Sequence, residues 1–117
     1  MRYLGLCAAA AASLAAGSAR AQAEDQTKDL RCVALMASML GNPQFASLKD
    51  SSSAGLFYFL GRAEGRQPKM DLGAQLSRVR EDLPITQYED ETRRCFAALK
   101  RKNDELKALG DAQPAKR

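Results

Sequence analysis

The chain has 117 residues, with 18 basic residues against 14 acidic ones, and a net charge of +4 at neutral pH. This length predicts one small domain with a marginal core, since a domain of this size buries only about two-thirds of its unfolded surface. The sequence contains no histidine, which excludes histidine-based acid–base catalysis, catalytic triads and most zinc sites.

Residues 1–23 predict a secretory signal peptide. Arg2 supplies the positive start, an apolar and alanine-rich stretch follows, and small-x-small sites end at Ala21 and Ala23. We expect cleavage after one of these two alanines and export to the periplasm or the medium. The alternative is a retained membrane anchor, but the apolar run is shorter than the roughly 20 residues that a spanning helix needs. A lipidated Cys7 is rejected because this cysteine begins the apolar region instead of ending it.

Loss of the signal peptide changes the charge balance. Without Arg2 and Arg20 the 18 basic residues become 16, against 14 acidic ones, and the net charge falls to +2. This balance gives no reason to expect a nucleic-acid partner. We divide the rest of the chain into a helical domain at 24–110 and a disordered tail at 111–117.

The first predicted helix covers residues 27–40, where apolar residues recur with the helical period. Its second half is apolar almost all round, which is typical of a helix at the centre of a core. Gly41 is a suitable residue to follow the helix, and Asn42-Pro43 prevents its continuation. One or two helical turns are expected over 43–49, with Phe45 and Leu48 facing inward.

The second predicted helix covers residues 54–64. The polar run Asp50 to Ser53 offers several N-caps before it, and Gly65 is the expected stop. The apolar run 56–60 could also form a strand, but the caps and the stop favour a buried helix. Gly61 and Gly65 lie one turn apart, which predicts close approach by another helix.

Two further helices are predicted. The third runs from a cap at Asp71 to about Asp82, with an amphipathic stripe made by Leu72, Leu76, Val79 and Leu83. The last helix starts at Thr86, which forms a capping box with Glu89, and stops at Gly110. Its expected inner face consists of Tyr88, Thr92, Cys95, Leu99, Leu106 and Leu109, with Phe96 beside it.

Cys32 and Cys95 are the two cysteines left after cleavage, so one intramolecular pairing is available to them. We expect a disulfide between the first and last long helices, worth about 4 kcal/mol in the chain-entropy description. The alternative is an unpaired or intermolecular thiol. The fold class is therefore all-α, a small bundle of about four to five helices with one disulfide.

No catalytic residue, metal ligand or cofactor motif stands out. The run Gly61 to Arg66 follows no predicted strand and is not a phosphate-binding loop of a recognised type. The basic run 100–102 with Lys107 could touch anionic lipid, but we interpret it as a solvated helix face and expect no contact with a membrane surface. The candidate binding surface is Tyr58, Gly61, Arg62 and Tyr88.

The layout resembles a known family. The chain has a cysteine in its first long helix, another in its last, and the aromatic–glycine stretch 58–61 between them. This arrangement, over roughly residues 30–99, is similar to the HdeA-like periplasmic acid-stress chaperones. The segments 58–62 and 70–72 also resemble parts of small exported alphaproteobacterial proteins of unknown function. The chaperone resemblance implies that acid loosens the fold or a dimer and exposes residues 33–40 and 56–60 to unfolded clients.

We therefore expect a non-enzymatic periplasmic protein that binds another envelope protein or the envelope. An acid-stress chaperone is the more specific alternative. A small-ligand carrier or enzyme with a pocket around Tyr58, Gly61 and Tyr88 is a second alternative. A structural or oligomeric role, including a homodimer, is a third.

Overall fold

The computed structural model describes the backbone of residues 7–114 and the side chains of residues 16–114. Four α-helices and two 3₁₀ turns occur in this range, and no strand does. Their order is α1 (Cys7–Leu40), η1 (Pro43–Leu48), α2 (Lys49–Arg66), α3 (Leu72–Asp82), η2 (Ile85–Gln87) and α4 (Tyr88–Asp111). The prediction of an all-α bundle is confirmed.

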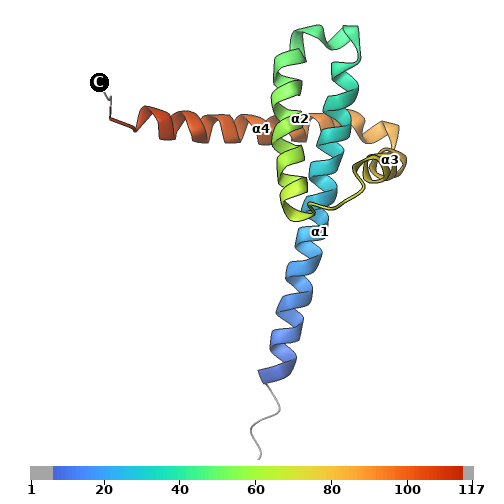
Figure 1. The fold of residues 1–117 in the computed structure, drawn as a ribbon, viewed down its shortest axis with the longest axis vertical. Helices are drawn as coiled ribbons and strands as arrows, with labels where there is room; N and C mark the ends of the chain where they lie inside the picture. Colours follow the sequence, from blue (N-terminus) through green and yellow to red (C-terminus); the bar gives the residue numbers. More distant parts are fainter. Residues whose placement is uncertain (1–6, 115–117) are drawn as a thin grey trace, which may run out of the picture.

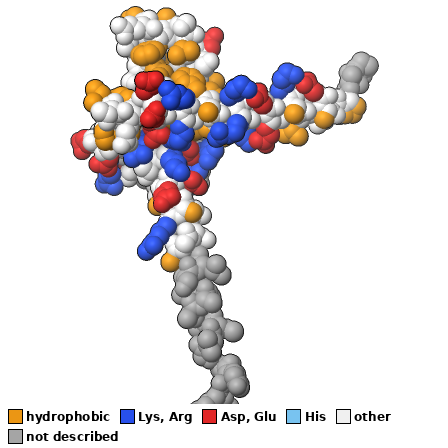
Figure 2. All heavy atoms as spheres, turned by 180° about the vertical axis from the view of Figure 1, so that it is seen from behind, with side chains coloured by type: hydrophobic (Ala, Val, Ile, Leu, Met, Phe, Trp, Pro, Cys, Tyr) orange, Lys and Arg blue, Asp and Glu red, His pale blue; other side chains and the backbone are white. Residues whose placement is uncertain are grey.

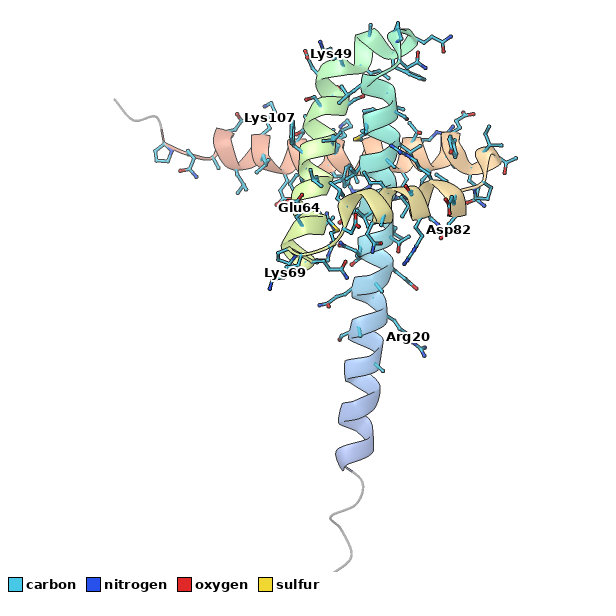
Figure 3. All side chains as sticks on the ribbon, turned by 45° about the vertical axis from the view of Figure 1, so that its right-hand side comes forward. Arg20, Lys49, Glu64, Lys69, Asp82 and Lys107 are labelled. Atoms are coloured by element: carbon cyan, nitrogen blue, oxygen red, sulfur yellow. A yellow bond between two sulfur atoms is a disulfide. The ribbon has the colours of Figure 1, made fainter. Side chains whose placement is uncertain are left out.

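The helices form a cross with two free arms (Figure 1). The second half of α1 and all of α2 lie side by side and antiparallel, with η1 at the corner between them. The chain then turns into α3, which packs on α1, and α4 crosses behind the α1–α2 pair. The first half of α1 and the second half of α4 project from this body. Side chains crowd together where the four helices meet (Figure 3).

The core lies at this crossing. One cluster surrounds the disulfide and a second lies under α3. The first consists of Cys32, Val33, Leu35, Met36, Phe59, Leu83 and Cys95, and the second of Leu30, Ala34, Ala63 and Val79.

The predicted disulfide is confirmed. Cys32 of α1 and Cys95 of α4 are bonded, with their Cα atoms 5.6 Å apart. Both residues are fully buried. The bond therefore fixes α4 against the middle of the core.

Helix α1 ends at Leu40 as predicted, but its expected start at Thr27 is wrong, because the helix already runs from Cys7. The alanine-rich segment before residue 27 contains no proline and consists largely of good helix formers, which allows the helix to extend backward. The expected signal peptide falls partly on this segment, and residues 1–6 lie outside the described range.

The corner between α1 and α2 differs from the prediction in its details. Asn42 caps η1, with its side-chain oxygen accepting from the Gln44 backbone N–H at 3.0 Å. Helix α2 follows η1 without a break, so the predicted start at Ala54 and the serine N-caps are wrong.

Ser52 lies inside the helix and is fully buried, where its hydroxyl lies 3.7 Å from the Met39 sulfur. Leu48 is exposed, against the expectation that it faces inward.

The surroundings of the glycines in α2 also differ from the prediction. The helix runs past Gly65 to Arg66, and a Cβ at Gly61 or Gly65 would meet no atom within 4 Å. No helix of the described chain therefore approaches these two residues, and the predicted close contact is wrong. The glycine in close contact is Gly55, where a Cβ would lie 2.3 Å from the Met36 sulfur and 3.2 Å from a methyl carbon of Leu99.

Helix α3 follows the prediction closely. Asp71 caps it by accepting from the Ala74 backbone N–H at 3.0 Å, and the helix ends at Asp82. Along its predicted stripe, Val79 and Leu83 are buried and Leu72 and Leu76 are half-buried.

The start of α4 differs from the prediction. The predicted capping box is wrong, because Thr86 lies inside the η2 turn and the residue before α4 is Gln87, which makes no side-chain cap. The chain is already helical at Thr86, whereas a capping residue must have an extended backbone. The side chain of Glu89 pairs with Arg93 instead.

The inner face of α4 is only half covered. Cys95 and Leu99 are buried, and Thr92 and Phe96 are half-buried. Leu106 and Leu109 are 56% and 55% exposed, so their expected place on a covered face is wrong. They belong to the part of α4 that projects beyond the body, and the helix passes Gly110 to end at Asp111.

Candidate functional site

The candidate site is an apolar groove between the η1 end of the α1–α2 pair and the first turns of α4. It has a volume of about 340 Å³. Hydrophobic side chains gather on this part of the surface, above α4 in Figure 2. We call it the Tyr88 groove, and its lining residues are Leu35, Ser38, Met39, Phe45, Tyr88, Glu89 and Thr92.

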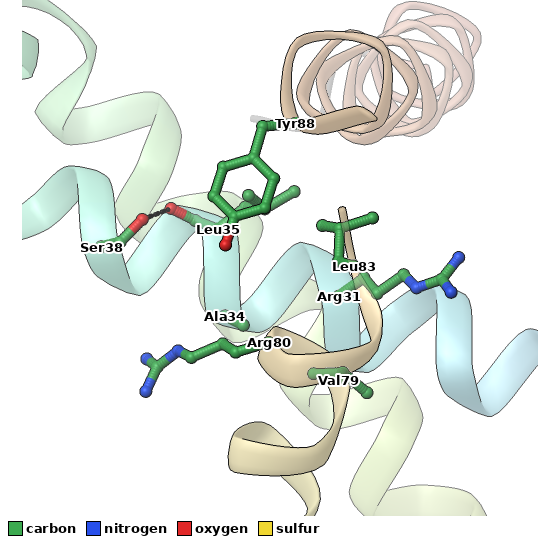
Figure 4. A pocket seen from close by; sticks show the side chains of 8 residues that line it. All are labelled: Arg31, Ala34, Leu35, Ser38, Val79, Arg80, Leu83 and Tyr88. Atoms are coloured by element: carbon green, nitrogen blue, oxygen red, sulfur yellow. Dashed lines mark hydrogen bonds between the residues drawn. The ribbon is translucent and has the colours of Figure 1, made fainter. Parts of the chain in front are cut away.

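A second, smaller cavity of about 170 Å³ adjoins the groove and shares Leu35, Ser38 and Tyr88 with it. Its other walls come from α1 and α3. The Tyr88 ring lies over Leu35, and the Arg31 and Arg80 side chains point away to opposite sides (Figure 4). Tyr88 therefore separates the two hollows.

The sequence around the α3–α4 link explains the position of this ring. Leu83 is buried against the first core cluster, and Pro84 then turns the chain with an extended backbone. The η2 turn closes with a hydrogen bond from the Gln87 N–H to the Pro84 carbonyl at 2.9 Å. Tyr88 follows as the first residue of α4, so its place is set by the anchored end of α3.

Two of the polar side chains of the Tyr88 groove, Ser38 and Glu89, are engaged in local contacts. Ser38 donates to the Leu35 carbonyl at 2.7 Å, and Glu89 pairs with Arg93 at 2.9 Å. Neither is placed as a nucleophile beside a base. The groove offers apolar surface and hydrogen-bonding edges, which suits binding.

An ion-pair network lies beside the smaller cavity and over the disulfide. Glu91 of α4 accepts from Arg31 of α1 at 3.2 Å and also pairs with Arg94. Arg94 donates to the Lys28 carbonyl at 3.0 Å, and its guanidinium lies 3.4 Å from the Cys32 sulfur. These contacts join α4 to α1 on the outer side of the disulfide.

A second polar cluster joins α1 to α2. The buried carboxylate of Asp29 accepts from Arg62 at 3.1 Å and from Arg66 at 2.6 Å. Gln26 donates to the Ala63 carbonyl at 3.0 Å and accepts from Arg66 at 3.1 Å. Because the carboxylate keeps two guanidinium partners, its burial is compensated.

Arg62 is held from two sides. The Tyr58 hydroxyl accepts from it at 2.9 Å, and this hydrogen bond is the main reason that the pKa of Arg62 is raised. Partial burial opposes the shift, and the Asp29 carboxylate adds to it. The guanidinium is therefore charged throughout the working pH range.

The structure brings together only part of the predicted binding surface. Tyr58 and Arg62 contact each other, and the Arg62 guanidinium also lies 5.5 Å from the centre of the Tyr58 ring. Gly61 is exposed on the outer face of α2. Tyr88 lies in another place, because neither hollow that it lines includes any of the other three residues. The four residues do not form one site.

Sequence reasoning assigned most of the groove to the core. Leu35 and Met39 belong to an apolar helix, and nothing in their spacing indicates that one edge stays uncovered. Phe45 gave the best available signal, since it is an aromatic residue in a short turn after Pro43. Asp29 and Gln26 were missed because each is a single polar residue in a polar stretch.

Neither a metal site nor a membrane-spanning helix occurs among the described residues. No group of three or more Cys, Asp or Glu residues there could hold a metal ion. No helix in that range is both long and apolar enough to span a bilayer.

No family model, curated protein or solved structure matches this chain. The resemblance to HdeA-like chaperones and to small exported alphaproteobacterial proteins therefore stays a prediction.

Proposed function

We propose that this chain is an exported, non-enzymatic binding module that accepts an apolar segment of another envelope protein in the Tyr88 groove. The observation that carries the proposal is the groove itself, an open apolar hollow of about 340 Å³. Contiguous exposed apolar surface on a soluble domain typically marks an interaction site. Aromatic and methionine side chains, such as Phe45, Tyr88 and Met39, are enriched at such interfaces.

The buried disulfide supports export, because disulfides form and persist in oxidising compartments. The body of the protein also begins after both expected cleavage sites. Among the described side chains of α1, which begin at residue 16, Gln26 and Asp29 are the first that are buried. Removal of residues 1–23 would therefore leave the described hydrogen bonds and ion pairs between α1 and α2 intact.

Site-specific photo-crosslinking in cells that export the protein tests this proposal. A photoreactive amino acid replaces Phe45 at the groove edge in one variant and the 82%-exposed Ile85, which lies outside the groove, in another. We expect a discrete protein adduct from position 45 and none from position 85. Thr92→Arg, which fills the groove with a charged side chain, should abolish the adduct. Equal adducts from both positions, or none from position 45, would contradict the proposal.

Acid-stress chaperone activity is the second candidate, and the two ion-pair clusters favour it. Asp29 and Glu91 have side chains only 5% and 11% exposed. Asp29 pairs with two arginines of α2, and Glu91 pairs with Arg31 of α1 and with Arg94 of its own helix. Loss of these carboxylate contacts would leave the arginines without partners and weaken the contacts of α1 with α2 and α4. Light scattering by an aggregating client protein at about pH 2.5, with and without this domain, tests the idea. A scattering trace unchanged by the domain would dismiss it.

A further inference from the structure

The outer face of α2 carries an uncovered seam. Residues along it recur with spacings of four, three, four and three, as in the contact line of paired helices. All of them are exposed, and they point away from the buried side of the helix, which holds Gly55, Phe59 and Ala63. The seam consists of Asp50, Ala54, Phe57, Gly61 and Glu64. Phe57 at its centre is 68% exposed, and a Cβ at Gly61 would meet nothing within 4 Å.

The projecting part of α4, residues 100–111, carries a matching line. Leu99, Lys102, Leu106 and Leu109 follow one another with spacings of three, four and three. Leu99 is buried against the body, and the same line then continues through the two exposed leucines. Hydrophobic side chains lie along the lower edge of this arm in Figure 2. The apolar face of α4 therefore extends past the surface that covers its first half.

We propose that a second copy of this chain covers both surfaces, with the α4 arm of each copy packed along the α2 seam of the other. Leu106 and Leu109 would contact Phe57 and the open backbone at Gly61 of the partner copy. Because α4 crosses α2 at a steep angle, a two-fold axis through the corner between them makes the contact reciprocal (Figure 1).

The dimensions of the two surfaces agree. From Leu99 to Asp111 the arm is about 18 Å long, and from Asp50 to Glu64 the seam is about 21 Å long, at 1.5 Å per helical residue. Half the surface of an arm of this length is about 400 Å². A single arm on a single seam would bury too little for a stable complex, whereas two reciprocal contacts bury about 1,600 Å² in total, the size of a standard interface.

The seam and the arm also carry side chains of opposite charge. The seam ends in Asp50 and Glu64, and neither forms an ion pair among the described side chains. The arm carries Lys102 and Lys107 on either side of Leu106. The half-buried Lys102 pairs with Glu105 and the exposed Lys107 pairs with Asp111, both within α4, and such ion pairs near the surface are weak enough to exchange.

Sedimentation equilibrium of the purified exported protein tests the proposal over a concentration series. We expect a dimer, and Leu106→Glu with Leu109→Glu should raise its dissociation constant at least tenfold. Phe57→Glu, on the α2 seam, should also raise the dissociation constant at least tenfold. Ala108→Glu, on the opposite face of the arm, is the matched control and should change the constant less than twofold. Circular dichroism checks that each variant keeps its helix content.

Crosslinking between copies tests the arrangement itself. A mixture of Phe57→Cys protein and Leu106→Cys protein should form a disulfide-linked heterodimer, and Phe57→Cys mixed with Ala108→Cys should not. A monomer at every concentration would overturn the proposal. A dimer that is insensitive to Leu106→Glu with Leu109→Glu, or equal crosslinking to residues 106 and 108, would overturn it too.

Discussion

The side chain of Met36 occupies the space that any Cβ at Gly55 would need. Such a Cβ would lie 2.3 Å from the Met36 sulfur and 2.7 Å from its methyl carbon. Met36 is 1% exposed and belongs to the cluster around the disulfide. The contact between α1 and α2 therefore depends on the absence of a side chain at Gly55 and on the long, unbranched side chain of Met36.

Gly55→Ala should consequently destabilise the fold. The alanine gains about 1 kcal/mol in helix propensity but must displace a buried methionine, and overpacking a core costs about 1–3 kcal/mol. We expect a net loss of about 1 kcal/mol in urea unfolding. Gly65→Ala, where a Cβ meets open space, is the control and should be neutral or stabilising. Equal stability of the two variants would show that Met36 relaxes freely.

Removal of the disulfide should cost about 4 kcal/mol, since it frees a long loop in the unfolded chain. Cys32→Ser with Cys95→Ser is the variant, and urea unfolding with and without reductant is the measurement. Reductant should lower the stability of the parent protein and leave that of the double variant unchanged. A double variant as stable as the parent would contradict the estimate.

Asp29→Asn should lower the free energy of unfolding by about 2 kcal/mol, because Arg62 and Arg66 lose their shared partner. This expected loss of stability is smaller than that for a fully buried ion pair, because the Arg62 side chain is 42% exposed. Glu89→Gln, which removes an ion pair that is exposed on both sides, is the matched control and should change stability by less than about 0.5 kcal/mol. Equal effects of the two changes would contradict the structural role of Asp29.

The intact mass of the exported protein should correspond to a chain that begins at Gln22 or Glu24. The melting temperature of this form should match that of the full chain within about 3 °C, because residues 16–25 are exposed and contribute no buried contact. A mass that includes Met1, or a lipid on Cys7, would contradict the signal-peptide interpretation.

The sequence predicts those features that depend on local chemistry. The cap at Asp71, the break at Asn42-Pro43 and the stripe of α3 follow from residue type and spacing, and each is confirmed. The disulfide pairing was also predictable, since only two cysteines follow the predicted signal peptide.

Other features depend on neighbours that are distant in sequence. Ser52 resembles a cap, but η1 runs directly into α2 and places it against Met39. Gly61 and Gly55 look alike in the sequence, and only the position of α1 distinguishes them. Leu106 continues a regular inner face, and nothing local shows that the body ends before it. The groove was missed for the same reason, because its residues have the spacing of a core.

The connection at residues 67–70 between α2 and α3 is exposed at Gln67, Pro68 and Lys69, and it lies between the two cysteines in the sequence. A protease that cuts there produces two fragments, one containing Cys32 and the other Cys95. The fragments cannot separate while the sulfur bridge is intact, and they would migrate as one species until a reductant is added. The protein thus has a closed covalent ring through its core, and a single cut in that ring leaves every helix attached.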